Sequence, residues 1–186
     1  NAITGLNDHL LTHLYKSIAK AKSIRIIVAF LMESGAKLIS DQLAAAAARG
    51  VPVKIKILTG TYLSVTEPSA LYYLKSKLGS AVEIRLYNGP VRSFHPKAYI
   101  FEHEDGGEIY VGSSNLSRSA LTDGVEWNYH FTRSVAPEDY AAFVRTFDEL
   151  FAHYSTVADE ESLKEYAASW RKPRLTREES SGPPEP

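Results

Sequence analysis

The sequence predicts an α/β fold, a mixed β-sheet sandwiched between α-helices, and two observations support this prediction. In the first half of the chain, short apolar runs alternate with segments of helical periodicity, which is typical of strand–helix–strand crossover units. Between residues 93 and 131, three strand-like runs follow one another, and the turn-forming stretch HEDGGE separates the first two, which indicates antiparallel pairing. With 186 residues, the chain is long enough for one sizeable core.

The first half of the chain alternates three helical patterns with three strand patterns. Leu6, Leu10 and Leu14 recur at helical spacing, Gly50 is a typical helix end, and Pro68 is a typical first residue of a helix. The runs IRIIVAF, VPVKIKIL and VEIRLY are rich in β-branched residues and indicate strands. We therefore expect helices over 6–22, 33–50 and 68–79, and strands over 24–30, 51–58 and 82–87.

The second half is dominated by strands and closes with two helices. We expect strands over 93–101, 109–115 and 124–131, and helices over 137–154 and 160–170. The last residues lack apolar periodicity, which is typical of a linker. The predicted organisation is a main domain over 1–155, a C-terminal helix over 156–170 and a linker or flexible tail over 171–186. Because the chain begins with Asn and ends in SSGPPEP, we expect it to be a module of a longer protein.

Composition excludes several classes of function. The chain has no cysteine, which excludes disulfides, thiolate catalysis and thiolate metal sites. No apolar run approaches the roughly 20 residues of a membrane helix, so we expect a cytoplasmic protein without a membrane partner. The net charge is −1, but residues 1–80 hold ten Lys and Arg against four Asp and Glu, whereas residues 81–186 hold eleven against eighteen. This asymmetry fits a basic face for a polyanion, or helix faces that differ in charge.

The stretch SFHPKAYIF, residues 93–101, holds an ionisable pair in a strand that is apolar on both sides. Alternation along a strand puts His95 and Lys97 on one face with Tyr99 and Phe101, and it puts Ala98 and the other apolar side chains on the opposite face. Burying charged groups is costly unless they are paired or used. The pair is therefore a candidate for function.

Two further segments supply the partners that such a pair would need. VGSSN brings Gly112, Ser113 and Asn115 to a strand end, where backbone N–H groups, hydroxyls and an amide can meet an anion. GVEWN brings Glu126 into an otherwise apolar run. A phosphodiester requires this set of groups, because its oxygens need cations and neutral donors, its phosphorus needs a nucleophile, and a nucleophilic histidine needs a carboxylate to orient it.

Together, HPKAYIFE, GSSN and EWN resemble the signature of the phospholipase D superfamily, in which His-x-Lys, four residues and Asp precede Gly-Ser and Asn. His95 and Lys97 match the His and Lys, and residues 112, 113 and 115 match the Gly-Ser-x-Asn. Glu126 matches the downstream Glu of the bacterial nuclease branch. The chain departs from the motif at Glu102, which stands where the family has Asp and where the family's acid is assigned a structural role.

The resemblance implies a phospholipase D-like fold and a mechanism without metal or cofactor. This chain has one such motif, and single-motif members form homodimers that build one site across the two-fold axis and act mostly as DNA nucleases. In that mechanism His95 attacks phosphorus to form a phosphohistidine, and the partner's His95 protonates the leaving oxygen. Lys97 and Asn115 would bind the non-bridging oxygens, Ser113 would support them, and Glu126 would orient a His95 ring. The expected partners are DNA, a second copy, and a fused helicase or DNA-recognition domain.

Other readings of these residues stay open at the level of sequence. His95 and Glu126 could be structural, and Arg92 and Arg118, which flank the motif, could contact a substrate backbone. His9 and His13 have the spacing of metal ligands on a helix, but no third ligand is marked, so we expect a solvated face and no metal site. The alternative functions are a lipid phosphodiesterase, and a catalytically silent module for DNA binding or dimerisation. DNA versus RNA, and single versus double strands, are not determined.

Overall fold

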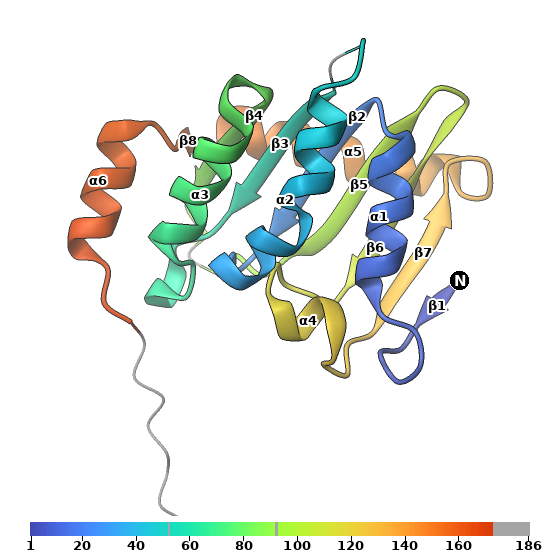
Figure 1. Cartoon of the computed structure of the whole chain (residues 1–186), viewed down its shortest axis with the longest axis horizontal. Helices are drawn as coiled ribbons and strands as arrows, with labels where there is room; N and C mark the ends of the chain where they lie inside the picture. Colours follow the sequence, from blue (N-terminus) through green and yellow to red (C-terminus); the bar gives the residue numbers. More distant parts are fainter. Residues whose placement is uncertain (52, 92, 173–186) are drawn as a thin grey trace, which may run out of the picture.

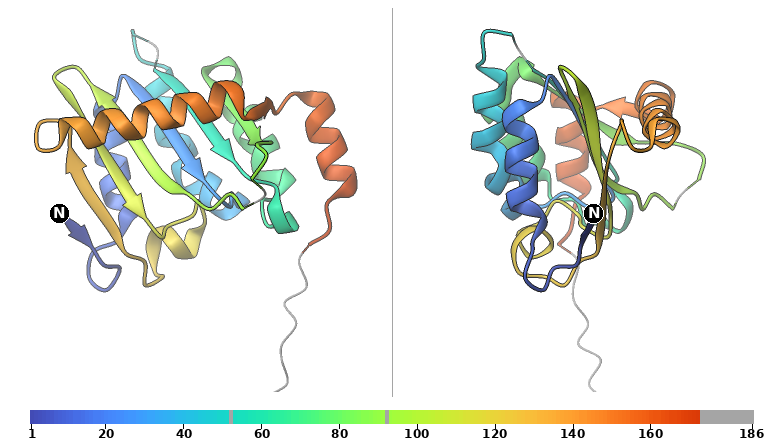
Figure 2. Two further views of the ribbon diagram at one scale, coloured as in Figure 1. Left: turned by 180° about the vertical axis from the view of Figure 1, so that it is seen from behind. Right: turned by 90° about the vertical axis from the view of Figure 1, so that its right-hand side faces the viewer.

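The computed structural model describes residues 1–51, 53–91 and 93–172, and it confirms the predicted α/β fold. Within these ranges, eight strands form one mixed sheet in the order β1-β7-β6-β5-β2-β3-β4-β8. The helices α1, α2 and α3 cover one face, and α5 covers the other (Figures 1 and 2). The strands are β1 (Ala2–Ile3), β2 (Ser23–Val28), β3 (Lys54–Thr59), β4 (Val82–Tyr87), β5 (Lys97–His103), β6 (Gly106–Gly112), β7 (Asn128–Thr132) and β8 (Ser155–Val157). The helices are α1 (Leu10–Lys20), α2 (Glu33–Ala47), α3 (Pro68–Leu78), α4 (Arg118–Thr122), α5 (Pro137–His153) and α6 (Glu160–Ser169).

One end of the sheet collects the segments that sequence analysis singled out. The parallel strands β2, β3 and β4 all finish at this end. β5 and β7 begin here and β6 finishes here, because Val28 pairs with Lys97 and Gly112 pairs with Asn128 in antiparallel register. We call this end the site end. Ligands of open α/β sheets commonly bind outside the carboxyl ends of the parallel strands.

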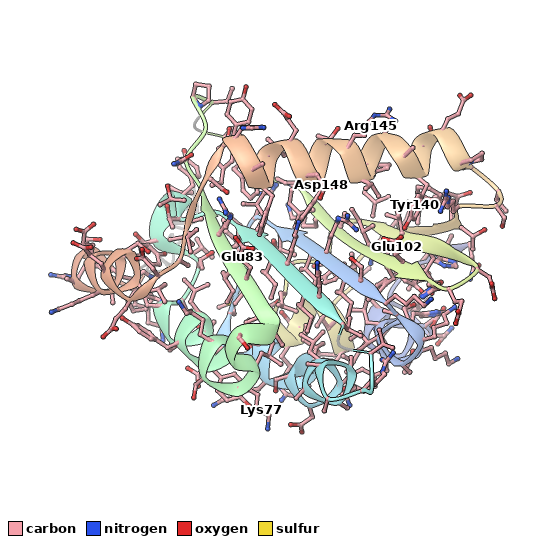
Figure 3. The ribbon with its side chains drawn as sticks, turned by 90° about the horizontal axis from the view of Figure 1, so that it is seen from above. Lys77, Glu83, Glu102, Tyr140, Arg145 and Asp148 are labelled. Atoms are coloured by element: carbon pink, nitrogen blue, oxygen red, sulfur yellow. The ribbon has the colours of Figure 1, made fainter. Side chains whose placement is uncertain are left out.

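Two cores lie on the two faces of the sheet. Tyr99 and Phe101 belong to the larger core beneath α1, α2 and α3, whereas Ala98 and Ile100 belong to the smaller core beneath α5. The predicted division of this strand into two apolar faces is therefore confirmed. Figure 3 shows α5 lying over its face of the sheet, with Glu102 and Asp148 between the helix and the strands. Both carboxylates are ion-paired to Arg25 of β2, at 3.7 and 3.0 Å.

Several predicted strand bounds were wrong, and two of the corrected starts concern the site. β5 begins at Lys97 rather than Ser93, so His95 lies in the preceding loop; Pro96 lacks the N–H that a ladder position needs. β7 begins at Asn128 rather than Gly124, so Glu126 also lies in a loop. The predictions missed β1, β8 and α4, which have only two, three and five residues and are too short to show a period.

The C-terminal segment contacts both the sheet and the stretch between β3 and α3. β8 crosses the predicted boundary at residue 155 and pairs with β4, and the Tyr166 hydroxyl and the Trp170 indole donate to the carbonyls of Thr66 and Ser64, at 2.6 and 2.7 Å. The division into a main domain and a C-terminal helix remains a prediction. Most of the predicted tail, residues 173–186, lies outside the described residues. Within the described part of the chain, no helix combines the length and apolarity that crossing a membrane requires.

Candidate active site

His95 and Lys97 are in direct contact at the site end, although the contact does not arise from a shared strand face. Lys97 is the first residue of β5 and is only 9% exposed, whereas His95 is exposed in the loop before it. The Lys97 ammonium lies 2.5 Å from His95 Nδ1 and donates to the His95 carbonyl at 2.9 Å. Burial lowers the pKa of Lys97, and the negative charge of Glu126 acts in the opposite direction. The Lys97 ammonium is therefore buried and lies beside an exposed imidazole.

Phe30 connects this pair to Asn115 and was missed by the sequence analysis. Its ring packs edge-on against the His95 ring, with centroids 5.5 Å apart. Its backbone N–H donates to Asn115 Oδ1 at 3.0 Å, and its carbonyl accepts from the N–H of Leu116 at 3.3 Å. Because the N–H can only donate, the amide oxygen must face it, and the Asn115 NH₂ group is the part left to donate to a ligand. Nothing in the sequence distinguishes Phe30 from any apolar residue at the end of a strand.

Ser113 and Glu126 form a second pair, from the end of β6 and the loop before β7. The Ser113 hydroxyl donates to the Glu126 carboxylate, and it accepts from the backbone N–H of Trp127 at 3.0 Å. The N–H of Ser113 donates back to the Trp127 carbonyl at 3.0 Å. A Cβ on Gly112 would stand 2.1 Å from that same carbonyl, so only glycine permits this approach. The glycine of the GSSN stretch thus positions Ser113 against Glu126.

Buried polar contacts hold the loop between the two pairs. Ser114 is fully buried; its hydroxyl donates to the Ala120 carbonyl at 3.2 Å and accepts from Asn128 Nδ2 at 2.8 Å. The Tyr99 hydroxyl donates to the Ser114 carbonyl at 3.1 Å. These bonds tie the GSSN loop to the strands on either side. The loop is therefore fixed by its neighbours and can hold donors in one arrangement.

The structure gathers five of the candidate residues at the site end, namely His95, Lys97, Ser113, Asn115 and Glu126. Arg118 begins α4, where its N–H donates to the Ser34 hydroxyl at 3.2 Å, and its side chain is exposed. Arg92 lies outside the described residues. Glu102 is near the opposite end of β5, five residues from Lys97 and thus roughly 17 Å away along the strand. Its partner is Arg25, a contact that fits the structural role that the resemblance implies for the motif acid.

No metal-binding cluster accompanies these groups in the described ranges. No three His, Asp or Glu side chains there are grouped so as to hold an ion. His13 instead bonds to Asp8, at 2.7 Å. A cavity of about 290 Å³ does open beside His95 and Lys97, beneath α5. Its other walls are mostly apolar and include Val111, Phe143 and Phe147.

A buried carboxylate at the far end of β6 was not predicted. Glu108 accepts hydrogen bonds from Ser17, His103 and His130 at 2.7–2.8 Å, and Lys20 lies 2.9 Å from it. Burial by itself would raise the pKa of Glu108, but the bonds from these four donors outweigh burial and lower the pKa to about 2. Glu108 is the last residue of the HEDGGE stretch, which the sequence analysis assigned to a turn, so its burial in β6 was not expected. The network is remote from His95 and serves the fold.

Comparison with known proteins identifies the family of this chain. A sequence model described as "Cardiolipin synthase, PLD-like domain" matches residues 14–153. No curated protein sequence matches the chain. Nuc from Salmonella typhimurium, described as a phospholipase D family member, superposes with a TM-score of 0.64 at 19% identity, over 84% of this chain and 95% of its own. NucT from Helicobacter pylori gives 0.62 at 17% identity, over 78% and 89%. The motif residues lie together at the site end, and the family model covers most of the chain. The chain therefore belongs to the PLD-like domain family of the phospholipase D superfamily.

Proposed function

We propose that the chain is a metal-independent phosphodiesterase that cleaves DNA through a phosphohistidine on His95. The observation that supports this most is the contact between an exposed imidazole and a buried ammonium, together with Phe30, which contacts both the His95 ring and the Asn115 amide. A cation and a neutral donor beside a nucleophile meet the needs of a phosphodiester anion. The names of the structural neighbours Nuc and NucT also favour a nuclease.

The proposed reaction has two displacements. In the first, His95 Nε2 attacks phosphorus, the bond from phosphorus to the leaving oxygen breaks, and a protonated histidine gives that oxygen its proton. In the second, water attacks the phosphohistidine, the phosphorus–nitrogen bond breaks, and the second histidine takes the proton from water. Lys97 and Asn115 stabilise the negative charge on the non-bridging oxygens in both steps.

The contact between Lys97 and His95 has a consequence for the first step. An ammonium can only donate, so His95 Nδ1 accepts from Lys97 and a neutral ring carries its proton on Nε2. Attack through Nε2 requires the other tautomer. A bound phosphate would draw the Lys97 ammonium onto its oxygens and free Nδ1 to donate to a carboxylate. We assign that acceptor role to Glu126, whose carboxylate is held by Ser113 in the free chain.

A homodimer supplies the second histidine. The motif occurs once in the chain, whereas the reaction uses one histidine as nucleophile and another as acid. A two-fold axis brings a surface patch against its own copy, so an exposed His95 can meet the partner's His95. In the whole protein, a fused helicase or DNA-recognition domain would supply the choice of target.

A lipid phosphodiesterase is the second candidate, and the apolar cavity beside His95 is the observation that favours it. The test is incubation of the chain with plasmid DNA, single-stranded DNA and phosphatidylglycerol vesicles, each in excess EDTA. We expect DNA to be cleaved despite the chelator. Release of a lipid headgroup without DNA cleavage would select the second candidate. Loss of DNA cleavage in EDTA would require a metal, and salt-sensitive DNA binding without cleavage would indicate a silent binding module.

A further inference from the structure

A row of apolar side chains is exposed beside the site. Val125, Trp127 and Tyr129 are 73%, 71% and 56% exposed. Between them, Glu126 turns to Ser113, and Asn128 is buried with its amide on Ser114. Glu126 and Asn128 thus face Ser113 and Ser114, whereas the three side chains that alternate with them face solvent. We call these three residues, of which Trp127 and Tyr129 are aromatic, the aromatic row.

Backbone bonds fix the position of this row relative to the catalytic groups. Trp127 exchanges hydrogen bonds with Ser113 through both its N–H and its carbonyl. Tyr129 pairs in register with Val111, so the two side chains share a face, and Val111 lines the cavity that also holds His95 and Lys97. The row therefore runs from the GSSN loop along the α5 face of the sheet towards the cavity.

Aromatic contacts connect the row to α5, but α5 does not cover the end of the row that lies near the site. The Tyr129 ring stacks on Phe131 with centroids 6.2 Å apart, and Phe131 in turn packs on Phe143, a wall of the cavity, at 6.0 Å. Figure 2 (left) shows α5 crossing the sheet near the end of β7, away from the site end where β7 begins. Phe131 is buried there, whereas Trp127 and Tyr129 stay open to solvent.

We propose that Trp127 and Tyr129 stack on unpaired bases beside the scissile phosphate, which makes single-stranded nucleic acid the substrate class of this site. The inference rests on the proposed function. A phosphate held by Lys97 places its flanking bases within reach of the row. Indole and phenol rings stack on any base, and their two-residue spacing, roughly 6.7 Å along a strand, gives each ring its own base. In a duplex the base faces are already stacked and are closed to such contacts.

The charges around the row fit this occupant. Glu126, the acidic residue within the row, is bonded to Ser113, and the Lys97 ammonium lies at the site end to receive the backbone phosphate. The aromatic faces therefore meet the bases while the cation meets the phosphate. This division between phosphate contacts and stacking platforms is typical of single-strand binding proteins.

The test uses two single strands of about 12 nucleotides, oligothymidylate and an abasic strand with the same number of phosphates. Binding of each strand is measured with proteins that all carry His95→Ala, which prevents cleavage. Trp127→Ala should weaken oligothymidylate binding roughly 5- to 150-fold, and should change abasic binding less than about twofold. Trp127→Phe, which keeps a ring, should retain most of the affinity. Tyr72→Ala, which removes an exposed tyrosine from α3, is the matched control and should leave both affinities unchanged.

Three outcomes would overturn the inference. Equal affinity of Trp127→Ala and its parent for oligothymidylate would show that the ring does not stack. Equal weakening on both strands would assign Trp127 to the phosphate site. A change from dimer to monomer in light scattering, with both affinities lost, would make the row a contact between copies. Cleavage by the wild type, measured separately on both strands, reports on the proposed function itself, so the two can fail independently.

Discussion

Replacing His95 with alanine should lower kcat for DNA cleavage by at least about 10⁴-fold. In the proposed dimer the same residue is the nucleophile in one chain and the acid in its partner, so a single substitution removes both groups. KM should change much less, because Lys97 and Asn115 still bind the phosphate oxygens. Steady-state cleavage of a fluorescent oligonucleotide in EDTA measures both constants.

His153→Ala is the matched control, because His153 is an exposed histidine on α5 that is absent from the described site. Its kcat should stay within about twofold of the wild type. A His95→Ala protein that keeps its fold, by circular dichroism, and retains a tenth of its activity would remove His95 from the role of nucleophile.

Replacing Glu108 with glutamine should destabilise the fold by about 3 kcal/mol at pH 7. The pKa of Glu108 is lowered from 4.5 to about 2, and a shift of that size corresponds to about 3 kcal/mol of stabilisation by the ionised carboxylate. Since the folded pKa is the lower one, the stabilisation is complete above pH 4.5 and is lost as the pH falls towards 2. The gap between wild type and variant should therefore close over that range. Urea unfolding at pH 7, 4 and 2.5 measures it.

Glu104→Gln is the control for this substitution. Glu104 lies at the turn of the same hairpin and is ion-paired with Lys22 at 3.2 Å, but it is exposed. Exposed pairs contribute little, so its unfolding free energy should change by less than about 1 kcal/mol at every pH. Equal losses of unfolding free energy in the two variants would mean that the buried network around Glu108 stabilises the fold no more than an exposed ion pair does.

The alternation of side chains made part of this site predictable. The period of two along residues 97–101 separates Tyr99 and Phe101 from Ala98 and Ile100, and the register with β2 preserves that division. Lys97 is the buried first residue of this strand, as its place in the apolar run predicted. The order of helices and strands also followed from apolar periodicity, because the long elements bury a regular stripe or face.

The position of His95 could not be derived in the same way. The strand pattern seemed to continue through residues 93–96, but Pro96 ends the ladder, and His95 turns back on Lys97 and the Phe30 ring. Phe30 lies 65 positions away in the chain, so this contact is a product of tertiary packing. The contact of Ser113 with Glu126 has the same origin, since the antiparallel pairing of β6 and β7 brings their loops together.

The exposure of the aromatic row could not be predicted from the sequence either. The WNYHF segment has the composition of a core strand, and Phe131 does lie in a core. Trp127 and Tyr129 lie near the start of β7 and are exposed, whereas α5 crosses the sheet near the end of that strand (Figure 2). The path of that helix depends on the whole of the sheet. Composition alone could not distinguish a buried ring from a stacking surface.

The stereochemical course at phosphorus tests the central claim most directly. A chiral phosphorothioate dinucleotide cleaved in ¹⁸O-labelled water records how many in-line displacements occur. Attack by His95 and then by water inverts phosphorus twice, so the account requires net retention of configuration. Net inversion would show that water attacks the diester in a single step, and it would contradict the phosphohistidine.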